Sequence, residues 1–135
     1  MKCFFDTNVL LDVLADREPF AKASEAALTR ATTGGNAAVA SVLSFWNLAY
    51  LLRKLFPTDK LRETLCSLAK TAKPADVTSK TLEMAFASTV PDFEDAIQIA
   101  CAVEAGADVI ITRNVAHFDG SPLPVLTPLS FVFLD

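Results

Sequence analysis

Short apolar segments alternate with longer stretches of helical periodicity along this chain, and this alternation constrains its fold more than any other feature. The apolar segments have the length and the bounding turn residues of β-strands, at residues 2–5, 37–40, 109–112 and 124–126. Because helices of 10–15 residues separate the strands, the connections are crossovers and the strands run parallel. We therefore predict an α/β fold, a three-layer sandwich with a short, mostly parallel central sheet flanked by helices.

Helices are expected where apolar residues recur at helical spacing beside a start or stop signal. Gly34-Gly35 and Gly106 end two of them, because glycine readily adopts the left-handed conformation of a helix C-cap. Ser41 and Ser44 are alternative N-caps for the third helix, and residues 73–78 are assigned to a loop or a strand. The predicted helices cover residues 9–15, 20–33, 45–55, 58–71, a segment capped at 78 or 79 and ending at 87, and 91–105, before a last turn from 128.

The composition is typical of one globular domain and excludes several classes of function. With 135 residues, 52% of them hydrophobic and 21% charged, we predict a single domain over residues 1–135. No apolar run approaches the roughly 20 residues of a membrane span and no signal peptide is visible, so we expect a cytoplasmic protein. The formal net charge of −4 argues against binding nucleic acid through bulk charge. A single histidine rules out a multi-histidine zinc site.

Polar residues suited to chemistry occur at three points of the predicted fold. They follow the first strand, follow the strand at 109–112, or open a late helix: Asp6 and Asn8, Arg113 and Asn114, and Asp92 and Asp95. Because ligands of a parallel sheet bind beyond the carboxyl ends of its strands, we expect the three groups to meet at one edge. Oxygen ligands of this kind suit Mg²⁺ or Mn²⁺, which usually keep several waters.

Repulsion between Asp6 and Asp95 is the physical reason to expect a cation at that edge. Two carboxylates about 5 Å apart repel by about 3 kcal/mol at an effective dielectric constant near 20. The fold gains no stability from such a pair, whereas a divalent cation converts the repulsion into a binding site. The same cation can lower the pKa of a bound water that attacks phosphorus, so the pattern indicates phosphodiester hydrolysis.

Each of these residues also has a purely structural interpretation. Asp6 is a suitable N-cap for the helix that follows the first strand, and Asp92 for the late helix. Asn8 and Asn114 are common turn formers. Arg113 is either a phosphate contact or a solvated surface charge.

The histidine and the aromatic residues also have structural interpretations. We interpret His117 as structural. Phe45, Trp46 and Tyr50 recur at helical spacing, and we favour a core or dimer contact for them over a platform on which bases stack.

Three sequence blocks in this order are far more specific together than any one of them alone. They read Phe5-Asp6-Thr7-Asn8-Val9-Leu10-Leu11-Asp12, then Asp92-Phe93-Glu94-Asp95-Ala96-Ile97-Gln98, then Ile111-Thr112-Arg113-Asn114 with Phe118. The blocks resemble the successive motifs of PIN domains, a family that includes the VapC-like ribonuclease toxins of bacterial toxin–antitoxin pairs. The resemblance covers nearly the whole chain.

The resemblance assigns roles to individual acids. In PIN domains the first aspartate and the aspartate at the late helix start ligate metal, and the matching residues here are Asp6 and Asp95. Family members usually carry a glutamate in the helix after the second strand, where Asn47 or a neighbour stands, and often an acid where Asn114 stands. We count Asp92 as an additional catalytic acid that compensates for these neutral amides.

The same resemblance implies a function, a cofactor and partners. It predicts an endoribonuclease that uses Mg²⁺ or Mn²⁺, acts on RNA, forms a homodimer and pairs with a small antitoxin protein. Around the metal ligands, three asparagines would orient water or metal and an arginine would neutralise phosphate charge: Asn8, Asn47 and Asn114, and Arg113.

Two other functions compete with the nuclease. The missing helix glutamate favours a degenerate PIN domain that binds RNA or a protein partner without cutting. A phosphotransfer domain also has an aspartate after its first strand. However, a phosphatase of that kind would need a second aspartate at Asn8, and a receiver domain would need paired acids and a late lysine. Neither pattern is present.

Overall fold

Five short parallel strands form the centre of the molecule, as the computed structural model shows over residues 1–135. They are β1 (Lys2–Phe5), β2 (Ala37–Ser41), β3 (Ala72–Ala75), β4 (Val109–Ile111) and β5 (Val125–Leu126). Their order across the sheet is β3-β2-β1-β4-β5, and every neighbouring pair is parallel. The chain therefore reverses its direction of winding between β1 and β4, which is where open α/β sheets bind ligands.

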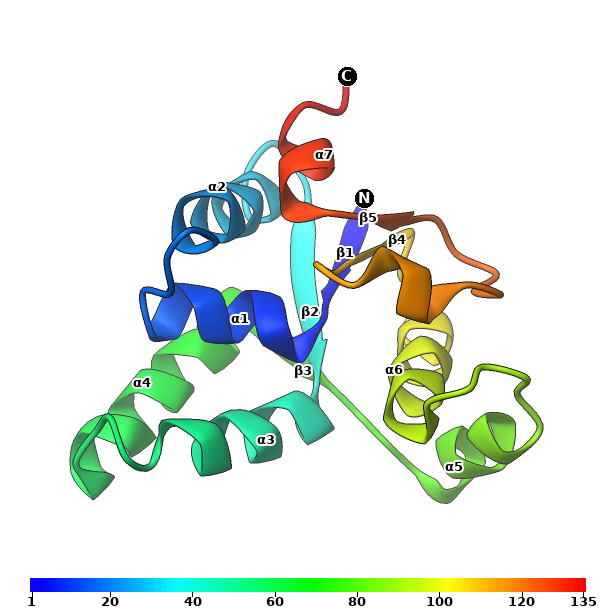
Figure 1. Ribbon diagram of the computed structural model, residues 1–135, viewed down its shortest axis with the longest axis horizontal. Helices are drawn as coiled ribbons and strands as arrows, with labels where there is room; N and C mark the ends of the chain where they lie inside the picture. Colours follow the sequence, from blue (N-terminus) through cyan, green and yellow to red (C-terminus); the bar gives the residue numbers. More distant parts are fainter.

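Helices cover both faces of the sheet, which confirms the predicted three-layer α/β sandwich (Figure 1). One face carries α1 (Thr7–Leu14), α2 (Ala21–Ala31), α3 (Val42–Leu52), α4 (Thr58–Thr71) and α7 (Pro128–Val132). The other face carries α6 (Phe93–Glu104) and the 3-10 helix η1 (Val115–Phe118), and α5 (Ser79–Phe86) packs against α6. No helix is both long enough and apolar enough to cross a bilayer.

Side chains of the strands alternate between two hydrophobic cores, because successive residues of a strand point to opposite faces. On β1, Cys3 and Phe5 are buried in the core beneath α1–α4 and α7, whereas Phe4 is buried beneath α6 and η1. Strands covered on both faces consist of continuous apolar residues, which is why β1, β2 and β4 were detectable in the sequence.

Several helix bounds differ from the sequence-based prediction, and the 3-10 helix η1 was not predicted. Two of the differences have identifiable reasons. The helix expected at 45–55 begins at Val42, because the Ser41 hydroxyl caps it by accepting from the backbone N–H of Leu43 at 2.9 Å. The ambiguous stretch at 73–78 contains the end of β3, which is an edge strand. Lys73 and Pro74 are exposed there, as is usual at a sheet edge, and so the apolar pattern of a strand is missing.

Candidate active site

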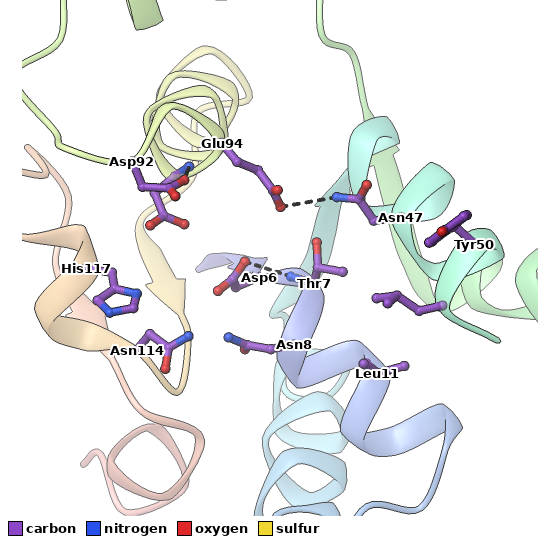
Figure 2. A pocket seen from close by; sticks show the side chains of 12 residues that line it. Asp6, Thr7, Asn8, Leu11, Asn47, Tyr50, Asp92, Glu94, Asn114 and His117 are labelled. Carbon is purple, nitrogen blue, oxygen red and sulfur yellow. Dashed lines mark hydrogen bonds between the residues drawn. The ribbon is translucent and has the colours of Figure 1, made fainter.

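An acidic cavity of about 410 Å³ lies beyond the carboxyl ends of β1 and β4 (Figure 2). Its walls come from the start of α1, from α3, from the start of α6 and from the loop between β4 and η1. All but one of the predicted site residues line it: Asp6, Asn8, Asn47, Asp92, Asp95 and Asn114. The exception is Arg113. The fold thus brings together polar groups that are up to about a hundred residues apart in the chain.

Asp6 is held rigidly at the base of the cavity, where it is 6% exposed. It caps α1, since its Oδ1 accepts from the backbone N–H of Thr7 at 2.8 Å, and its Oδ2 accepts from the Thr112 hydroxyl at 2.7 Å. Burial raises the pKa of Asp6, although these two hydrogen bonds oppose the shift. Each carboxylate oxygen retains a further lone pair, so capping and cation binding are compatible.

The start of α6 supplies further acids. Asp92 is the N-cap, and its Oδ1 accepts from the backbone N–H of Asp95 at 3.0 Å, which confirms its capping role. Burial, followed by the negative charges of Asp92 and Asp6, raises the pKa of Asp95 from 3.8 to about 6. The ionised form of Asp95 is therefore disfavoured unless a positive charge comes near.

Glu94 is an acid of the cavity that sequence analysis missed. It extends from the first turn of α6 towards α3, where its Oε1 accepts from Asn47 Nδ2 at 3.2 Å (Figure 2). Burial raises its pKa, and the charges of Asp6 and Asp92 add to the shift. A carboxylate from α6 thus lies beside the α3 position where a glutamate was expected. Acidity at a helix start was the available signal, but the sequence does not tell which acid faces the cavity.

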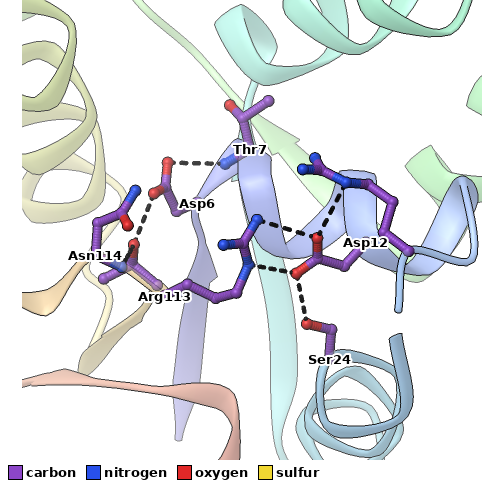
Figure 3. A network of polar contacts seen from close by, with 8 residues as sticks. Asp6, Thr7, Asp12, Ser24, Arg113 and Asn114 are labelled. Carbon is purple, nitrogen blue, oxygen red and sulfur yellow. Dashed lines mark hydrogen bonds and ion pairs between the residues drawn. The ribbon is translucent and has the colours of Figure 1, made fainter. Parts of the chain in front are cut away.

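Arg113 lies outside the cavity and is engaged by Asp12 (Figure 3). Its Nε donates to Asp12 Oδ2 at 2.6 Å and its Nη2 to Oδ1 at 3.1 Å, while Phe20 packs its ring 4.0 Å from the guanidinium carbon. Asp12 is fully buried and also accepts from the Ser24 hydroxyl at 3.1 Å. The arginine is therefore not a solvated surface charge. A phosphate contact would require it to leave a buried carboxylate, and that role stays an untested prediction.

The loop after β4 joins this ion pair to the cavity. Thr112 donates to Asp6 and accepts from the backbone N–H of Asn114 at 3.1 Å, whereas Arg113 between them contacts Asp12. Asp6 and Asp12 lie at the two ends of α1. Three consecutive residues of one loop therefore fix the position of α1 and of the Asp6 carboxylate.

A buried polar network beneath the cavity fixes three helices relative to one another. Gln98 of α6 is fully buried, and its Nε2 donates to the hydroxyls of Thr7 at 3.2 Å and Ser44 at 3.0 Å. The two hydroxyls are themselves 2.8 Å apart. Gln98 follows Glu94 and Asp95 by one helical turn, so its hydrogen bonds set how these acids of α6 face α1 and α3.

The donor set suits a hard cation, although no three His, Cys, Asp or Glu side chains are gathered closely enough to hold a metal as they lie. The cavity is lined by carboxylates and amides, with His117 as its only side chain able to carry positive charge. Asn8 lines it too, and the Oδ1 of Asn8 is buried without a hydrogen-bond partner. The carboxylate and amide oxygens of the lining are hard donors of the kind that Mg²⁺ and Mn²⁺ prefer.

Comparison with known proteins agrees with this architecture. A family model described as PIN domain matches residues 2–116, whereas no curated protein matches the sequence. A toxin–antitoxin complex from Klebsiella pneumoniae contains a similar chain, with 26% identity, a TM-score of 0.71 and coverage of 93% of this chain and 97% of that one.

Two further solved structures share the fold at lower identity. VapBC-1 from nontypeable Haemophilus influenzae is 16% identical with a TM-score of 0.73, covering 95% of this chain and 98% of that one. DNA-bound VapBC from Salmonella typhimurium is 14% identical with a TM-score of 0.67 and the same coverage of 95% and 98%.

Proposed function

Because this chain belongs to the PIN domain family, we propose that it is a cytoplasmic Mg²⁺- or Mn²⁺-dependent endoribonuclease, the toxin of a toxin–antitoxin pair. We further propose an antitoxin protein as its partner and a homodimer as its assembled form. The toxin–antitoxin complex that contains a chain 26% identical to this one supports the toxin role. The observation that carries the proposal is the cavity itself, which four carboxylates line at the reversal point of the sheet.

Asp6 and Asp95 are assigned as the metal ligands, with Asp92 as an additional catalytic acid. When bound, the ion supplies an activated water and neutralises charge on the RNA phosphodiester that is hydrolysed. Glu94 takes the place of the absent helix glutamate, because its carboxylate is held beside Asn47. The assignment therefore restores a charge that the sequence of α3 lacks.

The protein's own contribution is to hold these oxygens in fixed positions. Thr112 and the N–H of Thr7 orient Asp6 from one side, and Asn47 orients Glu94 from another. Asn8 and Asn114, which also line the cavity, orient water or substrate around the ion. Such preorganisation contributes most where charge develops during the reaction.

Cleavage of an end-labelled RNA in Mn²⁺ tests this proposal. We expect discrete products from the wild-type protein and none with a chelator or with Asp6→Asn, which keeps a good helix cap while removing the charge. Glu25→Gln, an exposed acid of α2, is the charge-matched control and should cut normally. Products that persist unchanged in Asp6→Asn would show that this cavity is not the source of cleavage.

A PIN domain that binds without cutting is the second candidate. It is favoured by two neutral amides, Asn47 and Asn114, at positions where the family carries acids. The two functions separate in one comparison: a binding domain retains RNA in the wild-type protein yet yields no metal-dependent products that Asp6→Asn lacks.

A further inference from the structure

An acidic cavity repels a polyanion, so a nuclease built around one needs another feature to hold RNA. The chain as a whole carries a net charge of −4 and offers no bulk attraction. Arg113 is engaged by the buried Asp12, and among the cavity's side chains only His117 is able to carry positive charge. Further contacts that hold RNA are therefore expected at the rim of the cavity.

The rim on the α3 side carries an exposed aromatic stripe. Trp46, Tyr50 and Arg53 follow one another at spacings of four and three residues, which places them on one face of the helix. Trp46 is 74% exposed and Tyr50 is 61% exposed. Tyr50 also lines the cavity, at the end away from His117 (Figure 2). The stripe is thus continuous with the proposed active site.

Arg53 gives this stripe its charge. Its guanidinium carbon lies 3.7 Å from the centroid of the Tyr50 ring, and its Nη1 donates to the backbone carbonyl of Tyr50. Unlike Arg113, it forms no ion pair, and the neighbouring Lys54 is exposed as well. An arginine fixed on an exposed aromatic ring offers a stacking surface beside a cation, and both are what single-stranded nucleic acid binds.

From these contacts we infer that Trp46, Tyr50 and Arg53, the α3 stripe, bind single-stranded RNA beside the acidic cavity. A base stacks on the aromatic rings and a phosphate contacts Arg53, so that the adjoining phosphodiester lies over the carboxylates. The inference rests on the proposed ribonuclease function, since it supplies the substrate contact for that site. It moves the phosphate contact from Arg113 to Arg53. Phe45, by contrast, is half-buried and packs against the core.

Charge complementarity favours RNA over a second copy of this chain as the occupant of the α3 stripe. Arg53 and Lys54 adjoin the aromatic rings, and each carries a positive charge without a carboxylate partner in the molecule. A second copy of this chain would bring the same cations face to face if the interface were symmetric. The test must therefore distinguish RNA bound to the α3 stripe from a protein bound there.

Trp46 is the only tryptophan, so its fluorescence reports on the α3 stripe alone. We would titrate the full chain with a single-stranded RNA of about 12 nucleotides, in chelator so that no cutting occurs. Quenching of Trp46 should saturate with RNA. Tyr50→Ala should weaken binding about tenfold and Tyr50→Phe should preserve it. Arg53→Ala should reduce the salt-dependence slope by about 0.7, whereas Arg62→Ala, an exposed arginine of α4, should not.

The inference is overturned if RNA leaves Trp46 emission unchanged, or if Arg53→Ala and Arg62→Ala bind RNA equally. Trp46 emission that shifts with protein concentration, and ignores RNA, assigns the α3 stripe to a protein interface instead. Because binding is measured without metal, such a failure leaves Mn²⁺-dependent cleavage standing. RNA binding through the α3 stripe without any cleavage contradicts the proposed nuclease function but supports the inferred RNA contact.

Discussion

Arg113 is paired with the fully buried Asp12, and this pairing ties the residue to the stability of the fold. We expect Arg113→Ala to destabilise the fold by about 3 kcal/mol, because the fully buried Asp12 carboxylate loses its two closest charged hydrogen bonds and keeps only Ser24 and the more distant Arg17. Urea denaturation measures this loss. The double variant Asp12→Asn/Arg113→Met should lose less unfolding free energy than the two single variants lose together. Weaker RNA binding with unchanged stability in Arg113→Ala would instead support the original phosphate contact.

The raised pKa of Asp95 predicts a pH dependence of stability in metal-free protein. Its pKa is about 6 in the folded state against 3.8 ordinarily, so the folded state binds this proton more tightly than the unfolded state. The contribution to stability is therefore complete below about pH 4 and is lost as pH rises through about 6. The unfolding free energy of wild type, in chelator, should fall more steeply across that window than that of Asp95→Asn. Parallel curves would contradict the assignment.

The first turn of α6 and the middle of α3 together position one carboxylate of the cavity. Asn47 donates to Glu94, so the two helices together present a carboxylate where the family usually places a glutamate on α3. Glu94→Gln should weaken Mn²⁺ binding about tenfold. In the Glu94→Gln protein, Asn47→Glu should recover part of the Mn²⁺ affinity. In the wild-type protein, Asn47→Glu instead places the new carboxylate beside that of Glu94. Calorimetric titration measures the Mn²⁺ affinity of each protein. Equal Mn²⁺ affinity in wild type and Glu94→Gln would exclude Glu94 from the metal site.

Some strands and contacts of this fold could be predicted from the sequence and others could not. β1, β2 and β4 were predictable because strands buried on both faces are continuously apolar, and Asp6 because it directly follows one of them. β3 was left ambiguous because its exposed Lys73 and Pro74 belong to an edge. The partner of Arg113 was not predictable, since Asp12 lies 101 residues away and no local pattern links the two.

Metal bound at the proposed site should also stabilise the folded protein against unfolding. With a dissociation constant near 1 mM, 10 mM Mg²⁺ should add about 1.4 kcal/mol to the unfolding free energy. For a domain of this size the Tm should rise by about 4–5 °C, in one cooperative transition if residues 1–135 form a single domain. Calorimetry on the double variant Asp6→Asn/Asp95→Asn should show no rise. An equal rise in both proteins would place the Mg²⁺ elsewhere.

We expect the acidic cavity to bind the metal on which RNA cleavage depends. The most direct test is the rate of cleavage of one RNA as Mn²⁺ is titrated, compared between wild type and Asp95→Asn. We predict a saturable rise whose midpoint in wild type equals the Mn²⁺ dissociation constant from calorimetry, and a midpoint shifted to higher Mn²⁺ in Asp95→Asn. A cleavage rate that does not depend on Mn²⁺, or superimposable curves for the two proteins, would show that the cavity does not bind the metal used in cleavage.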